Sequence, residues 1–246
     1  MRLRPWVLIA AATGLWFAAQ QTLSSAAWSE AQAQGGRLAV VELFTSQGCS
    51  SCPPADRYVG RLARRKDVIA LSFHVNYWDY IGWSDPFAST ETTQRQRDYR
   101  RSMGARFIYT PQLVVNGRNH SASLPRVDRL IGDPATRPSL SVTFIGDAQN
   151  HRVKIGAGPA RGTAAVWLIF YDKKHVTDVP RGENRGRQIR NYNVVREIRR
   201  IGTWTGKAIE IPISLIEAKR DGRGGCVVIV QQGRTGPILG AALLTL

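Results

Sequence analysis

One segment of the chain determines the expected fold, and it reads Leu38-Ala39-Val40-Val41-Glu42-Leu43-Phe44-Thr45-Ser46-Gln47-Gly48-Cys49-Ser50-Ser51-Cys52-Pro53-Pro54. Its first seven residues are mostly apolar, which predicts a buried strand. A pair of cysteines with two residues between them follows, and the prolines open a helix-like segment from Ala55 to Arg65. At such a turn the backbone N–H groups and the helix dipole can lower the pKa of a thiol. The stretch therefore predicts thiol–disulfide or thiol–metal chemistry.

The segments that follow this turn continue an α/β order. Residues 68–75 are apolar and β-branched and predict a second buried strand. Residues 89–103 predict a helix with Ser89 as its N-cap. A strand at 112–115, a turn at Asn116-Gly117, a returning arm at 118–122 and a helix at 124–131 complete the region. The order is a βαβ half followed by a ββα half, which is typical of a compact α/β layer.

The second half of the chain has a different pattern. Short alternating runs separated by turn residues predict an all-β sandwich or barrel; they lie at 140–145, 152–155, 164–171, 194–201, 207–213, 226–231 and 237–243. The predicted fold class is thus an α/β domain at 34–134 followed by a sandwich-like β-rich domain at 135–246.

The N-terminus has the features of a signal peptide at residues 1–33. Two arginines precede an apolar run from Trp6 to Ala19, which is short for a membrane span. The pattern Ala31-Gln32-Ala33 predicts cleavage after Ala33, with Ala27 as a second position; an uncleaved anchor is the alternative. We therefore expect a soluble periplasmic or secreted protein, in a compartment that permits a disulfide between the two cysteines.

The charge balance suggests partners. The formal net charge is +16, and the basic excess lies mostly after residue 134. Such an excess can attract a membrane surface or acidic partners, although a solvated basic surface is the simpler interpretation. Nucleic acid is a poor partner for an exported protein, and no nucleic-acid motif is present.

A second landmark links the first half to a known superfamily. Thr110-Pro111 stands directly before the strand at 112–115, and together with Cys49 and Cys52 in this element order it resembles a thioredoxin-like domain. More narrowly, the segments 42–49, 74–80 and 182–187 resemble those of a family of uncharacterised bacterial secreted proteins that have a thioredoxin-like domain. The resemblance implies a fold and a redox site, and it supplies no substrate.

The resemblance implies roles for the two landmarks. Cys49 would be the nucleophile and the more exposed sulfur, and Cys52 would resolve the mixed disulfide. Pro111 would follow a cis peptide bond, which proline tolerates, and would face the sulfurs. Thr110 would offer backbone groups to an extended substrate segment. The alternatives are a structural disulfide and an ordinary trans proline.

Three further residues are candidates near this site. The resemblance also implies that Glu42 is a buried acid that helps to deprotonate the second thiol. Its offset of seven residues from Cys49 is one longer than in thioredoxin-like proteins, which can turn its side chain to the other face of the strand, and a paired or partly solvated acid is the alternative. His74 and Trp78 follow the neighbouring strand, so they should lie at the same sheet edge as the cysteines. His74 would tune the thiolate or ligate a metal, or be a structural histidine. Trp78 would line a substrate groove or an interface.

Two other features remain open. Cys226 starts an apolar strand, which predicts a buried free thiol, with an extra redox partner as the alternative. The arginine-rich segment 181–200 is either an anion site or a solvated basic edge.

The sequence predicts an exported thiol–disulfide oxidoreductase that needs no cofactor. It would act with a protein disulfide or thiol substrate and an upstream redox partner. Copper handling by Cys49 and Cys52, with His74 as an optional further ligand, is one alternative, because soft thiolates favour Cu(I). A non-catalytic binding module is the other.

Overall fold

The structure is a computed structural model that describes residues 33–35, 37–147 and 150–246. The predicted signal peptide lies outside these residues except for Ala33. The helices are α1 (Pro53–Leu62), the 3-10 helix η1 (Asp79–Ile81), α2 (Thr90–Ser102), α3 (Leu124–Gly132) and α4 (Ile216–Arg220). The strands are β1 (Ala33–Gly35), β2 (Ala39–Thr45), β3 (Val68–His74), β4 (Gln112–Val115), β5 (Asn119–Ser121), β6 (Val142–Gly146), β7 (His151–Ile155), β8 (Ala164–Val179), β9 (Arg187–Trp204), β10 (Ile209–Ile213), β11 (Gly225–Gln232) and β12 (Ile238–Thr245).

Strands from both halves of the chain lie in one mixed sheet. Its order is β1-β12-β11-β8-β9-β3-β2-β4-β5, and β2 and β3 pair in parallel while β4 runs antiparallel to β2. The first region (residues 34–134) and the second region (residues 135–246) are joined within the sheet where β3 pairs with β9, at Ser72 opposite Val194. A second sheet, β10-β7-β6, packs its apolar side chains on the β8, β11 and β12 part of the large sheet.

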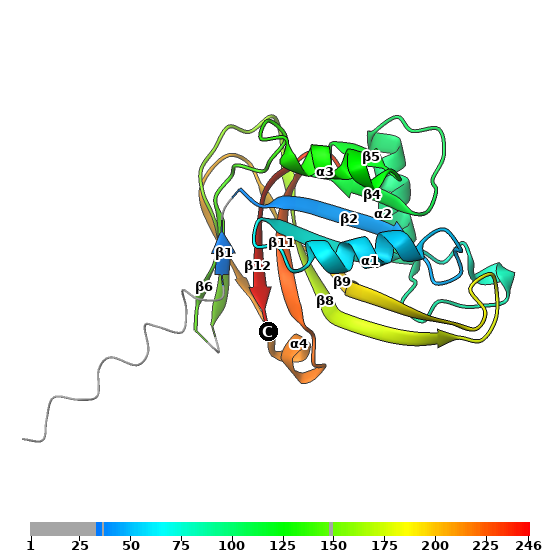
Figure 1. Cartoon of the computed structure of the whole chain (residues 1–246). Helices are drawn as coiled ribbons and strands as arrows, with labels where there is room; N and C mark the ends of the chain where they lie inside the picture. The colour runs from blue at the N-terminus through cyan, green and yellow to red at the C-terminus, as the bar shows by residue number, and fades with distance from the viewer. Residues whose placement is uncertain (1–32, 36, 148–149) are drawn as a thin grey trace, which may run out of the picture.

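Helices cover the two faces of the first region. Alternation along β2 sends Ala39, Val41 and Leu43 to the face covered by α1 and α3, and Val40 and Phe44 to the opposite face. Tyr99 of α2 packs on that opposite face, in a core that extends to Trp167 and Ile229 of the second region. In Figure 1, α1 lies across the front of the sheet.

The α/β class and the β-rich second half are confirmed. Ser89 caps α2 by accepting a hydrogen bond from the Thr92 N–H, as predicted. The free thiol of Cys226 is buried in β11, also as predicted. The strands predicted at 164–171 and 194–201 are too short. In the structure β8 continues to Val179 and β9 already begins at Arg187. The extra length is polar, so alternation of apolar residues does not reveal it.

The long β8–β9 hairpin positions the site. Its far end projects beyond the body of the sheet, on the side where the loop between β2 and α1 lies (Figure 1). Within the described residues no helix is long and apolar enough to cross a membrane.

Candidate functional site

Cys49 and Cys52 form a disulfide in the turn between β2 and α1. Cys52 is the N-cap of α1, and its carbonyl accepts hydrogen bonds from the N–H groups of Ala55 and Asp56. Prolines fill the first two helical positions, where N–H groups lack intrahelical partners. The positive end of the α1 dipole therefore points at the cysteine pair.

Both cysteines are buried, so the expected greater exposure of Cys49 is negligible in this conformation. Cys49 is 1% exposed and Cys52 is 0% exposed, whereas Ser50 and Ser51 between them face solvent. The Ser51 hydroxyl lies 3.3 Å from the Cys49 sulfur. The loop that exposes the two serines is covered on the Cys49 side by the β8–β9 hairpin, which the sequence pattern did not place there.

The Thr110–Pro111 peptide bond is cis. Because Gln112 of β4 pairs with Phe44 of β2, Pro111 stands at the end of β2 where the cysteine loop begins. The structure therefore brings the two sequence landmarks to the same end of the sheet.

Trp78 joins these two landmarks. Its indole Nε1 donates a hydrogen bond of 2.7 Å to the Thr110 hydroxyl. A Cβ added at Gly48 would come within 3.1 Å of the Trp78 Cβ, so only glycine fits here without a shift. Tyr80, two residues on, is 82% exposed. Trp78 thus lies against the cysteine loop, where the sequence expected it.

His74 is fully buried, so a substrate cannot contact it in this conformation. Its Nδ1 lies 2.6 Å from Asp85 Oδ2, and the same carboxylate accepts hydrogen bonds from the N–H groups of Gln47 and Phe87. Burial lowers the pKa of His74, but the Asp85 and Asp56 carboxylates outweigh it and raise that pKa overall. Burial likewise opposes ionisation of Asp85, yet His74 holds its pKa below the usual value. This position matches the alternative of a buried, hydrogen-bonded structural histidine, and it leaves no surface of His74 for a substrate to bind.

Glu42 lies on the face of the sheet that α2 covers, not on the α1 face. Its carboxylate accepts two hydrogen bonds from Arg95, at 2.6 and 2.9 Å, and one from the Tyr99 hydroxyl at 2.5 Å. The offset of one residue along β2 produces this reversal. The predicted help of Glu42 to the second thiol therefore does not fit the structure.

Asp56 is a buried acid on the α1 face that the sequence did not single out. It accepts a hydrogen bond of 2.9 Å from the Thr45 hydroxyl at the end of β2. Burial raises the pKa of Asp56 to about 7, and the nearby His74 limits the rise. In the sequence Asp56 is a single polar residue in the first turn of a helix, and no local pattern predicts that it is buried.

The end of the β8–β9 hairpin holds the cysteine loop. The Asn184 side-chain amide donates to the carbonyl groups of Gln47 and Cys49, both at 2.9 Å. Glu183 accepts from the Ser50 N–H at 3.2 Å. The Gln47 amide donates to Thr177 and Asn191 on the two arms of the hairpin. The segment 182–187, which the sequence linked to this site only through the family resemblance, thus contacts the turn that carries the cysteines.

The arginines of this hairpin are mostly exposed. Arg181, Arg185 and Arg190 face solvent, and Arg187 donates to the Asn184 side-chain oxygen at 3.0 Å. Within the described residues, no group of three or more His, Cys, Asp or Glu side chains is arranged to hold a metal ion.

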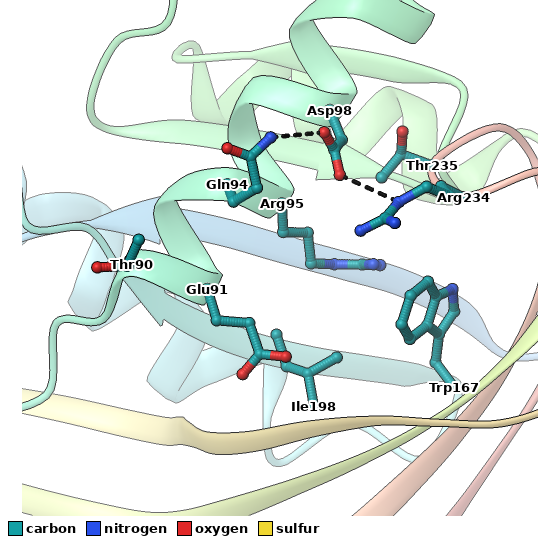
Figure 2. A pocket seen from close by; sticks show the side chains of 9 residues that line it. All are labelled: Thr90, Glu91, Gln94, Arg95, Asp98, Trp167, Ile198, Arg234 and Thr235. Carbon is teal, nitrogen blue, oxygen red and sulfur yellow. Dashed lines mark hydrogen bonds and ion pairs between the residues drawn. The ribbon is translucent and has the colours of Figure 1, made fainter.

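A cavity of about 200 Å³ lies away from the cysteines, between α2 and the strands of the second region. Figure 2 shows its lining, with Asp98 joined to Gln94 and Arg234 and with Trp167 on the opposite side. None of its lining residues belongs to the cysteine loop or the hairpin end. The candidate site is therefore defined by the buried disulfide and its polar surroundings, and not by this cavity.

Comparisons with known proteins agree with the fold. The X-ray crystal structure of a protein from Agrobacterium tumefaciens is similar over 84% of this chain and 93% of that chain, with 33% sequence identity and a TM-score of 0.74. No curated protein matches this chain. The model of the DUF1223 family, described as protein of unknown function, matches residues 40–231. The chain therefore belongs to the DUF1223 family, whose function is not known.

Proposed function

We propose that this protein is an exported thiol–disulfide oxidoreductase in which Cys49 attacks and Cys52 resolves. The observation that carries the proposal is the disulfide at the start of α1, next to the Thr110–Pro111 pair. The resemblance of residues 34–134 to a thioredoxin-like domain supports the same chemistry.

The geometry suits a two-electron exchange. In the reduced protein the Cys49 thiolate attacks a substrate disulfide, and one substrate sulfur leaves as a thiolate. The Cys52 sulfur then attacks the Cys49 sulfur of the mixed disulfide, which closes the Cys49–Cys52 bond and releases the second substrate sulfur. The α1 dipole and the Ser51 hydroxyl favour the Cys49 thiolate. A disulfide substrate gains the two electrons that the protein dithiol loses.

The partners follow from this chemistry. The substrate is a protein disulfide or thiol, and an upstream redox partner must restore the pair after each turnover. The predicted signal peptide is consistent with action in the periplasm or outside the cell. The exposed arginines of the hairpin border the cysteine loop, so an acidic substrate segment would be attracted to this edge.

The experiment measures reduction of a disulfide-linked fluorescent peptide by the protein with a dithiol reductant. Cys49→Ser is expected to abolish turnover, and Cys52→Ser to accumulate a mixed disulfide that non-reducing mass spectrometry detects. Cys226→Ser is the matched control, because that thiol is buried far along the chain in β11 and should not affect turnover.

Two results would contradict the proposal. If Cys49→Ser and Cys52→Ser keep full turnover, the pair does not carry the reaction. If the native disulfide resists every dithiol and forms no mixed disulfide, the protein is better described as a non-catalytic binding module. Binding of Cu(I) by Cys49 and Cys52 stays an alternative prediction, which a metal titration of the reduced protein tests.

A further inference from the structure

The exposed side of α1 carries arginines that pair with no carboxylate. Tyr58 and Val59 are buried against the sheet, whereas Arg57 and Arg61 are exposed on the opposite side of the helix, and Arg64 follows on that same side one turn later. The Arg61 guanidinium lies 5.2 Å from the centre of the Tyr58 ring. Within the described residues none of the three arginines forms an ion pair. Like charges at this spacing repel one another, so the row does not stabilise the helix.

Elements on both sides of α1 lie close to this row. The Tyr58 hydroxyl donates a hydrogen bond of 2.5 Å to Asp128 of α3, which places α3 beside α1, and Arg129 is exposed on the outer side of α3. On the other side of α1, a Cβ added at Gly60 would lie only 2.6 Å from the Tyr192 ring of β9. Figure 1 shows α3, α1 and β9 side by side on one face of the sheet.

Alternation in the β8–β9 hairpin brings two more cations to this side. Lys174 stands opposite Tyr192, and Arg190 lies two residues before it, so both side chains project from the face on which Tyr192 packs. Both cations are exposed, and Arg190 donates to the neutral side chain of Gln188 at 2.9 Å. Val176, opposite Arg190, is 49% exposed and adds an apolar side chain. We call this side the basic face, and its cations are Arg57, Arg61, Arg64, Arg129, Lys174 and Arg190.

Arginines on the α2 side of the sheet differ, because carboxylates neutralise them. Arg101 and Arg234 both form ion pairs with Asp98 there. Asp128 and Asp178 lie on the side of the basic face, but each already accepts a hydrogen bond from a neutral side chain. The basic face therefore presents excess positive charge to solvent.

We propose that the basic face binds the surface of a membrane that contains anionic phospholipids. Its cations come from three elements on one side of a sheet, so they can meet one broad anionic surface together, and each cation near such a surface strengthens binding. Arginine guanidinium groups also match the oxygens of phosphate headgroups. The half-exposed Val176 suits the boundary between headgroups and acyl chains. This contact is independent of the chemistry of the cysteines, and it holds the turn before α1 next to the lipid.

Vesicles of defined composition test the proposal. The chain without its predicted signal peptide is sedimented with vesicles of phosphatidylcholine alone, or of phosphatidylcholine mixed with phosphatidylglycerol. We expect binding to the anionic vesicles only, at about 0.1 M salt. Raising the salt to about 1 M should release the protein, because the screening length then falls from about 10 Å to about 3 Å.

Two sets of substitutions locate the contact. The combined Arg57→Gln, Arg61→Gln and Arg64→Gln variant should bind about 10- to 100-fold more weakly, because each cation near an anionic surface contributes about 5-fold. The combined Lys174→Gln and Arg190→Gln variant should bind about 5- to 25-fold more weakly for the same reason. Since the two sets lie on different elements, the second still tests the face if the first does not fold.

A matched control removes the same charge elsewhere. Arg152, Arg220 and Arg234 are exposed and pair with carboxylates away from the basic face. Their combined replacement by Gln should change binding by less than about 2-fold, because charges beyond the screening length contribute little.

Three results would overturn the proposal. The first is an absence of binding to the phosphatidylglycerol vesicles, and the second is an equal loss of binding in the control variant. The third is binding of soluble polyglutamate to the unmodified protein, lost in the variant of α1, while the vesicles stay unbound. That result would assign the basic face to an acidic protein partner.

Discussion

Two buried carboxyl groups lie on opposite faces of the sheet beside β2, and they differ in how completely they are paired. Glu42 accepts hydrogen bonds at both oxygens from Arg95 and a third from Tyr99. Asp56 accepts one hydrogen bond, from Thr45, and its other oxygen makes none among the described residues, although Asn191 lies near enough to favour the carboxylate. A fully paired carboxylate fixes the packing of its neighbours, whereas an incompletely paired one can still gain or lose a proton.

The α2 side shows what complete pairing achieves. The Arg95 guanidinium lies over the rings of Phe73, Tyr99 and Trp167, and it also donates to Gln231 of β11. Figure 2 shows this side chain extending from α2 towards the second region. This cluster ties α2 to both halves of the sheet, so we assign it to stability. The α1 side carries the Cys49–Cys52 disulfide on which the proposed function rests.

The largest expected effect is the loss of the paired cluster. Arg95→Ala leaves Glu42 buried without its countercharge, which should lower the free energy of unfolding by about 3–5 kcal/mol. Urea denaturation measures this loss. Arg97→Ala, on the exposed face of the same helix, should change it by less than about 0.5 kcal/mol. Under native conditions the rate of thiol–disulfide exchange at Cys49 and Cys52 should be unchanged in both variants. A loss below about 1 kcal/mol for Arg95→Ala would remove the contrast between the two faces.

The next effect concerns the pH dependence of stability. Burial raises the pKa of Asp56 from 3.8 to about 7 in the folded protein. Between these values the unfolded chain has lost the proton while the folded protein keeps it, so stability falls as pH rises through this window. At 1.36 kcal/mol per pKa unit, the cost above pH 7 is at most about 4 kcal/mol.

Asp56→Asn removes this cost. The variant should therefore be more stable than the unmodified protein at pH 8, and the advantage should shrink as the pH falls towards 4. Denaturation curves at pH 4, 6 and 8 measure the difference. An advantage that is the same at all three pH values would mean that Asp56 does not titrate in this range.

The contrast between the two faces also marks the limit of prediction from sequence. The order of elements through α3 followed from local patterns, because alternation, the Ser89 cap and the Asn116-Gly117 turn act over a few residues. The partner of Glu42 is 53 positions away in Arg95, and no local rule pairs them. The burial of Asp56 depends on Thr45 and on Asn191 of β9, which packing alone brings together. The cysteine turn and the position of Trp78 beside it could be predicted because their signals are local. The polar network around them could not be predicted in this way.

The smallest effect tests how the cysteine region is closed. The Asn184 amide holds the carbonyl groups of Gln47 and Cys49, and burial of Cys49 depends on this end of the hairpin remaining in place. Asn184→Ala leaves both carbonyls without this donor, at a cost of about 1–3 kcal/mol. Because these bonds form between the loop and the hairpin, their loss should favour local opening of the loop.

Local opening should be visible as faster reduction of the Cys49–Cys52 disulfide by an added dithiol. A cost of about 1–3 kcal/mol predicts acceleration of about 5- to 150-fold, measured by trapping the free thiols at timed intervals. Arg185→Ala is the matched control, because its exposed side chain lies on the same hairpin end and should leave the rate unchanged. An unchanged rate in Asn184→Ala would mean that the hairpin does not limit access to the disulfide. Faster reduction without a matching loss of global stability would show that the α1 side opens by itself, as its polar contacts predict, while the Arg95 cluster keeps the rest of the fold closed.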